Sequence, residues 1–231
     1  MQEPDVTNQL IAPQNATILL GCGDKEEDSL RFQAVAKKAR QDLKIEVQVC
    51  DLVAKHSEEY LQIHREAHSL GIPSNSTMLF GTIENINDRL IHMDKLRNLA
   101  DEYGLFQCFV PYPFLPDSTR LPEAQLATSN EILRTIAVSR LMLDSIPHIK
   151  AYRMNIGDEI AELALNFGAD DIDGTVRQES IMHLAGAKSS LDYGIYQMAK
   201  LVTDAGFVPV KRNTTYTKFL SVKPEPPKRA K

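Results

Sequence analysis

The sequence predicts an α/β fold, a partial (βα) barrel with six or seven parallel strands. Apolar runs of strand length alternate with segments of helical periodicity, and this alternation is typical of a parallel sheet joined by right-handed crossovers. A second observation is the stretch 147–175, whose strand–helix–strand pattern carries aspartates at positions 170, 171 and 173. Strands of parallel sheets are usually continuous apolar runs, so these carboxylates indicate a strand end that opens on a ligand-binding face.

The predicted elements follow one another in a single domain, residues 16–219, between a loose polar arm (1–15) and a disordered tail (220–231) rich in proline and basic residues. Strands are expected at 16–20, 45–50, 77–80, 105–110, 148–152 and, as a short last strand, 207–210, and a very short strand is expected at the aspartate-rich residues 170–173. Segments between them are expected as helices at 28–43, 58–69, 87–103, 128–146, 156–167, 177–187 and 192–205.

Capping residues support several of these helices. Ser57 stands at the N-cap position of the helix 58–69, and Thr128 or Ser129 caps the helix 128–146. The helix 156–167 has apolar residues at helical spacing and is followed by Gly168, the residue type preferred where a helix ends.

The composition is that of a soluble globular protein of 231 residues, with 43% apolar and 25% charged residues. A net charge of −5 argues against a nucleic-acid-binding surface, and no apolar run reaches the roughly 18 residues that a membrane span needs. Residues 1–15 lack the pattern of a signal peptide, and the three cysteines show no pairing pattern. These features predict a cytoplasmic protein.

The candidate site lies where parallel strands end, because ligand-binding groups of β/α proteins collect there. The ligand-binding candidates are Glu84, His148, Tyr152, Arg153, Asp171, Asp173 and Thr175. Structural roles remain open for four of them: a solvated loop carboxylate for Glu84, a hydrogen-bonded residue at the sheet end for His148, and a cap of the next helix for Asp173 or Thr175.

A metal site is not expected. His64 and His68 are four residues apart on one helical face, a spacing that can bind zinc, but the HExxH pattern and a third ligand are both missing. The GCGD turn at 21–24 matches a glycine-rich phosphate loop only loosely.

Several longer motifs occur in an order that resembles the C-terminal half of aminofutalosine synthase, a radical S-adenosylmethionine enzyme of the futalosine route to menaquinone. The motifs are HREAHSLGIPSNSTMLFGTIE, FVPYPFLPDSTRL, LRTIAVSRLMLDSIPH, PHIKAY, ALNFGADDIDGT, the AGA at 185–187 and AGFVPVKRNTTY. The resemblance extends from about residue 57 to 219. A sister family, the dehypoxanthine futalosine cyclases, is also similar; HIKAY and DDIDGT favour the synthase, whereas YPF and AGF favour the cyclase.

The resemblance implies a four-iron four-sulfur cluster, held by the three thiolates of a CxxxCxxC loop, and bound S-adenosylmethionine. It also implies the addition of an adenosyl-derived radical to an enolpyruvyl benzoate. The sequence contains no such loop, and Cys22, Cys50 and Cys108 are far apart. Thr82 stands where the family often has histidine, and Arg153 where it tends to have a large aromatic residue.

Three interpretations follow from these departures. The first is a synthase-like protein, either a shortened chain that lacks the first strands of the family's barrel or one whose cluster is supplied otherwise. Whether a second chain completes the barrel is left open. The second is an inactive paralogue that keeps the barrel as a module for binding an aromatic carboxylate or a nucleoside, or for an interaction. The third is a decayed reading frame without function.

Overall fold

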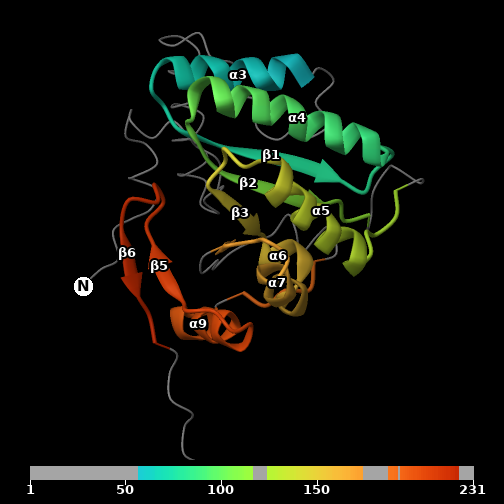
Figure 1. Ribbon diagram of the computed structural model, residues 1–231. Helices are drawn as coiled ribbons and strands as arrows, with labels where there is room; N and C mark the ends of the chain where they lie inside the picture. Colours follow the sequence, from blue (N-terminus) through green and yellow to red (C-terminus); the bar gives the residue numbers. More distant parts are fainter. Residues whose placement is uncertain (1–56, 117–123, 174–186, 192, 224–231) are drawn as a thin grey trace, which may run out of the picture. The chain divides into compact units, whose positions relative to one another are not determined.

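The computed structural model describes residues 57–116, 124–173, 187–191 and 193–223 (Figure 1). The strands expected at 16–20 and 45–50, the helix expected at 28–43, the arm 1–15 and nearly all of the helix expected at 177–187 lie outside these residues.

A four-stranded sheet with the order β1-β2-β3-β4 is the centre of the described fold. Its strands are β1 (Ser74–Phe80), β2 (Phe106–Pro113), β3 (His148–Ala151) and β4 (Asp171–Ile172). The N–H of Ser74 donates to the carbonyl of Leu105, and the N–H of Phe114 donates to the carbonyl of Phe80, so β1 and β2 run in the same direction. Lys150 and Ala151 pair in parallel register with Asp171 and Ile172.

The parallel α/β sheet predicted from the sequence is therefore confirmed. The described residues contribute four strands to this sheet, fewer than the predicted six or seven, and they do not show a closed barrel.

The chain divides into two compact units, and β1 and β2 pass from the first into the second. The first unit contains α3 (Ser57–Ser69), most of α4 (Ile86–Tyr103) and the first residues of β1 and β2. The rings of His64 and His68 are buried here against Phe106, and both donate to or accept from the hydroxyl of Ser74, at 2.7 and 2.9 Å. Strand β1 begins at Ser74, three residues before the expected Thr77, where the N–H of Ser74 bonds to the carbonyl of Leu105.

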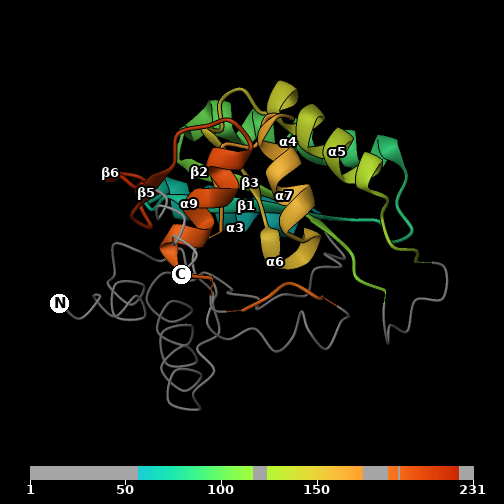
Figure 2. The same cartoon turned by 90° about the horizontal axis from the view of Figure 1, so that it is seen from below.

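The second unit holds the ends of the sheet strands, α5 (Ser129–Met142), α6 (Arg153–Ile156), α7 (Asp158–Leu165) and α9 (Ile195–Asp204). Helix α7 packs between α5 and α9 (Figures 1 and 2). No described helix combines the length and the apolar character needed to cross a membrane.

The helix expected at 156–167 is broken. Gly157 has a φ of 84°, which lies outside the helical range, so it ends α6 and begins α7. The strand expected to end at Tyr152 also stops earlier, because Tyr152 already caps α6.

The end of the chain differs most from the prediction. Strand β5 (Val210–Arg212) pairs antiparallel with β6 (Phe219–Ser221), whereas the sequence predicted one strand at 207–210 and a tail beginning at residue 220. The Asn213 side chain closes the turn by accepting from the N–H groups of Thr217 and Lys218, at 2.9 and 3.0 Å. The antiparallel pair is local and does not join the parallel sheet.

We expect acid to destabilise the fold through His64 and His68. Burial lowers their pKa from 6.5 to about 3 and about 4, so both rings are neutral in the folded state. Because the folded pKa values lie below the unfolded one, stability is full above pH 6.5 and falls as the pH drops from 6.5 toward 4. Urea unfolding at pH 7.5, 6.0 and 5.0 measures this, and His64→Gln should flatten the slope. An unchanged slope in the variant would contradict the prediction.

We expect Gly168→Ala to destabilise the protein more than Gly206→Ala. Both glycines have a positive φ, 105° and 90°, which costs an alanine roughly 1 kcal/mol. At Gly168 an added Cβ would also lie 2.8 Å from Cβ of Arg140, whereas at Gly206 it meets nothing within 4 Å. Moving Arg140 would cost its hydrogen bonds to Gly168 and Asp170, about 1–2 kcal/mol more. Equal unfolding free energies for the two variants would show that Arg140 moves without loss.

Candidate functional site

The carboxyl ends of the sheet strands lie in the second unit and bring four short segments to one edge of the sheet, which we call the carboxyl edge. They are residues 81–84 after β1, 113–114 at the end of β2, 152–155 after β3 and Asp173 after β4. Ligands of α/β proteins bind at this edge, because the loops there are free to carry polar groups.

Glu84 closes the turn after β1. Its carboxylate accepts from the N–H of Gly81 at 2.6 Å, from the N–H and the hydroxyl of Thr82 at 2.8 and 2.7 Å, and from Nε of Arg89 at 2.8 Å. Burial acts to raise the pKa of Glu84, but the hydrogen bonds from Thr82 and Gly81 outweigh it and hold the pKa below its ordinary value. Both carboxylate oxygens are thus engaged, and the geometry favours a structural role in the turn.

Tyr152 and Arg153 follow β3 but point to different surroundings. The Tyr152 ring meets the ring of Tyr112 from β2 edge to face, with centroids 5.0 Å apart. Arg153 is fully buried: Nη1 donates to Asp158 at 2.8 Å, Nη2 donates to the carbonyl of Ser190 at 3.0 Å, and the guanidinium lies over the ring of Tyr193 at 4.3 Å. The cation is used inside the protein and is not presented to a ligand.

Asp173 is the carboxylate of this edge that keeps an unused oxygen. Oδ1 accepts from the backbone N–H of Arg153 at 2.5 Å, whereas Oδ2 is buried and has no hydrogen-bond partner among the described residues. Burial raises the pKa of Asp173 to about 6, although the N–H of Arg153 and the charges of Arg153 and Lys150 act to lower it. Thr175, the remaining candidate, lies outside the described residues.

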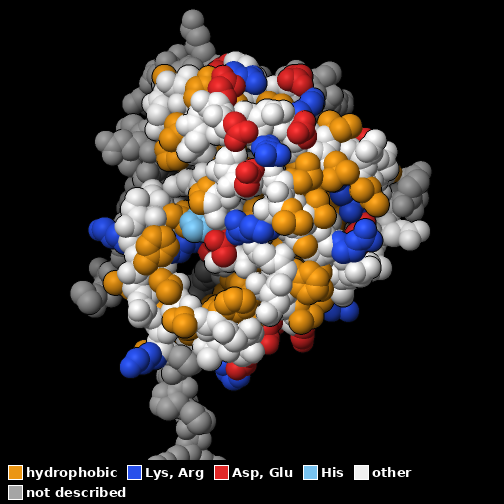
Figure 3. All heavy atoms as spheres, viewed as in Figure 1, with side chains coloured by type: hydrophobic (Ala, Val, Ile, Leu, Met, Phe, Trp, Pro, Cys, Tyr) orange, Lys and Arg blue, Asp and Glu red, His pale blue; other side chains and the backbone are white. Residues whose placement is uncertain are grey.

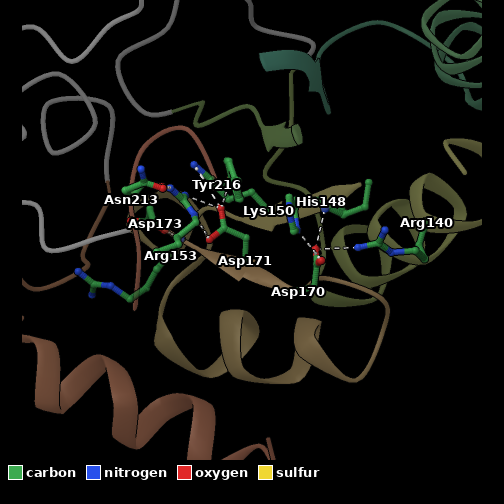
Figure 4. A network of polar contacts seen from close by, with 11 residues as sticks. Arg140, His148, Lys150, Arg153, Asp170, Asp171, Asp173, Asn213 and Tyr216 are labelled. Carbon is green, nitrogen blue, oxygen red and sulfur yellow. Dashed lines mark hydrogen bonds and ion pairs between the residues drawn. The ribbon is translucent and has the colours of Figure 1, made fainter. Parts of the chain in front are cut away.

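His148 lies at the opposite, amino end of β3 (Figure 4). Its Nδ1 is 2.8 Å from Oδ2 of Asp170, and Oδ1 of Asp170 accepts from Arg140 Nη2 at 2.7 Å and from the N–H of Ile149 at 2.8 Å. Groups at the amino ends of parallel strands usually serve stability. The structure thus separates His148 from the carboxyl edge and gives it the hydrogen-bonded role that the sequence left open.

Asp171 is held by two residues that the sequence did not single out, Arg212 and Tyr216. Arg212 donates to both carboxylate oxygens, at 2.8 and 2.6 Å, and the Tyr216 hydroxyl donates at 2.6 Å (Figure 4). Burial acts to raise the pKa of Asp171, but Arg212, together with Lys150 and Tyr216, holds it below its ordinary value. Tyr216, at a φ of 53°, also stacks on His148 with ring centroids 4.3 Å apart.

These contacts attach the β5–β6 hairpin to the sheet. In the sequence, the single feature that pointed to Arg212 and Tyr216 was that RNTTY belongs to a family motif.

On the face seen in Figure 3, acidic, basic and histidine side chains gather next to apolar ones beside a hollow.

The described residues do not fit an iron–sulfur cluster. Such clusters need several cysteine thiolates, and the cysteine within the described ranges, Cys108, is fully buried in the middle of β2. Within those ranges no group of three His, Cys, Asp or Glu side chains could hold a metal ion. His64 and His68 hydrogen-bond to Ser74 instead.

The parallel sheet and the polar groups at its carboxyl edge place the chain among the α/β proteins whose candidate sites lie at strand ends. Comparison of sequences is more specific. The chain belongs to the family described as the CofH/MqnC C-terminal region, whose sequence model matches residues 103–224. The family resemblance predicted from the motifs is therefore confirmed.

Curated relatives include both enzymes that the motifs indicated. The chain is 43% identical over 164 residues to aminodeoxyfutalosine synthase of Thermus thermophilus, which covers 69% of this chain and 44% of the relative. It is 40% identical over 174 residues to the Streptomyces coelicolor enzyme of that name, covering 70% and 44%. Cyclic dehypoxanthine futalosine synthase of S. coelicolor is 38% identical over 159 residues, covering 69% and 39%. The chain thus spans less than half the length of these relatives.

We expect Asp171→Asn to lower the free energy of unfolding by about 3 kcal/mol, because it leaves the mostly buried guanidinium of Arg212 without its countercharge. Urea unfolding at pH 7.5, followed by circular dichroism, measures the loss. The control is Asp204→Asn, which removes an exposed partner of Lys200 and should change stability by less than about 0.5 kcal/mol. Losses of equal size in the two variants would refute a special role for the Asp171 pair.

Proposed function

We propose that this chain takes part in menaquinone biosynthesis by the futalosine pathway, as a radical S-adenosylmethionine protein related to aminodeoxyfutalosine synthase. The observation that carries the proposal is the extent of the similarity: 43% identity over 164 residues to an enzyme of that name. The family match at 103–224 spans β2 to β6, and so includes Tyr152, Arg153 and Asp173 at the carboxyl edge.

In this function the described residues bind and orient the small-molecule substrate, an aromatic carboxylate or a nucleoside. The Tyr112–Tyr152 ring pair offers an apolar wall beside the strand ends, and Asp173 offers a hydrogen-bond acceptor. The buried Arg153 is a positioning residue, because its hydrogen bonds fix α7 and the segment before α9. Glu84 holds the turn after β1 in place.

The cluster and S-adenosylmethionine belong to the proposal through the family alone. The thiolates would have to come from outside the described residues, either from Cys22 and Cys50 or from a second polypeptide that completes the barrel. We derive no reaction step through the cluster, because the described residues do not fit it.

A second candidate function is an inactive paralogue that binds the small molecule without radical chemistry. The full burial of Cys108, the cysteine within the described ranges, favours it, because a buried thiol in the middle of β2 cannot serve as a cluster ligand. Both candidates use the same carboxyl edge, so they differ in turnover and in iron content rather than in ligand binding.

Anaerobic reconstitution of the purified chain with iron and sulfide tests the first candidate. The first candidate predicts about four irons per chain and, with S-adenosylmethionine, reductant and an enolpyruvyl benzoate, an adenosyl adduct detected by mass spectrometry. Omitting the benzoate is the control for adduct formation. Iron near zero with saturable benzoate binding would support the paralogue, and neither iron nor binding would contradict both candidates.

A further inference from the structure

Three polar atoms at the carboxyl ends of β3 and β4 are buried and have no hydrogen-bond partner among the described residues. They are Oδ2 of Asp173, Oδ1 of Asn155 and Nε of Arg153. The exposed fractions of the three side chains are 5%, 9% and 0%. A buried polar atom without a partner costs about 1–3 kcal/mol, so native proteins keep few of them, and such atoms often mark a functional site.

The residues that carry these atoms follow the carboxyl ends of two neighbouring strands. Ala151 and Ile172 are register partners, so the chain leaves β3 and β4 side by side, and the backbone N–H of Arg153 reaches Oδ1 of Asp173 at 2.5 Å. Asn155 lies two residues further along α6, whose first turn is fixed by the bond from its N–H to the carbonyl of Tyr152 at 2.9 Å.

The guanidinium of Arg153 does not serve the unpaired oxygen of Asp173. It turns away from the aspartates in Figure 4 and is held by Asp158, by the carbonyl of Ser190 and by the ring of Tyr193. Oδ2 of Asp173 therefore remains available to a ligand, although the backbone N–H of Arg153 bonds to Oδ1 of the same carboxylate.

We propose that Asp173 and Asn155 form a subsite for an uncharged ligand with two neighbouring hydroxyl groups, such as the cis-diol of a sugar. Two acceptor oxygens match two hydroxyl donors. A cationic ligand is disfavoured by the positive charges of Arg153 and Lys150, which act on Asp173, and an anionic ligand is disfavoured by the carboxylate itself. A divalent ion would need more oxygen ligands than these two.

The choice of a nucleoside as the probe rests on the proposed function. Adenosine has the cis-diol, and 2′,3′-dideoxyadenosine is identical except that it lacks both hydroxyls. Calorimetric titration of the full chain with each compound, without cluster, reductant or S-adenosylmethionine, measures the contribution of the diol. We expect adenosine to bind at least tenfold more tightly than the dideoxy compound.

Two variants assign this difference to the subsite. Asp173→Asn keeps an acceptor for the N–H of Arg153 but replaces the free oxygen by a donor, and Asn155→Ala removes the second acceptor. We expect each to reduce the preference for adenosine to less than threefold and to leave binding of the dideoxy compound unchanged. Asp204→Asn, on the exposed face of α9, is the matched control and should keep the full preference.

Thermal unfolding separates this role from a structural one. A carboxylate that only holds the fold would destabilise it when neutralised. Asp173→Asn keeps an acceptor for the N–H of Arg153 and removes a buried charge whose Oδ2 has no partner among the described residues, so this variant should be at least as stable as the wild type. Equal affinity of the two compounds for the wild type, no binding of adenosine, or an undiminished preference in both variants would each overturn the subsite. Because no turnover is measured, these outcomes are independent of whether the chain performs radical chemistry.

Discussion

The described fold of the second unit depends on one constraint: each buried carboxylate needs hydrogen-bond donors or a countercharge. Strand β4 has two residues, and it is flanked or occupied by Asp170, Asp171 and Asp173. A carboxylate that leaves water must find donors or a countercharge, since its desolvation otherwise costs several kcal/mol. The partners of these carboxylates come from four different elements, so satisfying them also assembles the unit.

Each aspartate fastens a different part of the chain. Asp170 joins Arg140 of α5 to the start of β3, through His148 and the N–H of Ile149. Asp171 joins the β5–β6 hairpin to the sheet through Arg212 and Tyr216. Asp173 accepts the N–H of Arg153 and so fixes the path from β3 into α6. Asp170 and Asp171 have donors at both carboxylate oxygens and stabilise the fold. Asp173 has a donor at one oxygen, so its other oxygen remains available to a ligand.

Local sequence patterns predicted the helices and strands that are determined by their own residues. The apolar spacing of α7 predicted a helix close to the observed one, and the run that starts at His148 predicted a strand close to β3. Gly168 does occupy a turn with positive φ. The hairpin could not be predicted in this way, because β5 and β6 are largely exposed and have no apolar alternation. What holds it is the Arg212–Asp171 pair, which joins residues 41 positions apart.

The sequence predicted where the candidate site lies better than it predicted which residues form it. The rule that ligands meet the carboxyl ends of parallel strands selected Tyr152 and Asp173, both of which lie there. The same rule could not separate His148, because one short strand carries His148 at its first residue and leads into Tyr152 just beyond its last. Arg212 and Tyr216 were missed because nothing in their own neighbourhood announces a carboxylate partner from β4.

Arg153 shows how one departure from the family pattern is accommodated. The side chain is fully buried, so its cation is not presented to an anionic ligand. Since a buried guanidinium needs compensation, it recruits Asp158 and the face of Tyr193, and the hydroxyl of Tyr193 completes the set by donating to Asp158. Gly157 makes this possible: its φ of 84° ends α6 after one turn and lets Asp158 begin α7 within reach of Nη1. The charge is thus neutralised inside the helical layer, and the carboxyl edge keeps the acceptor character of Asp173 and Asn155.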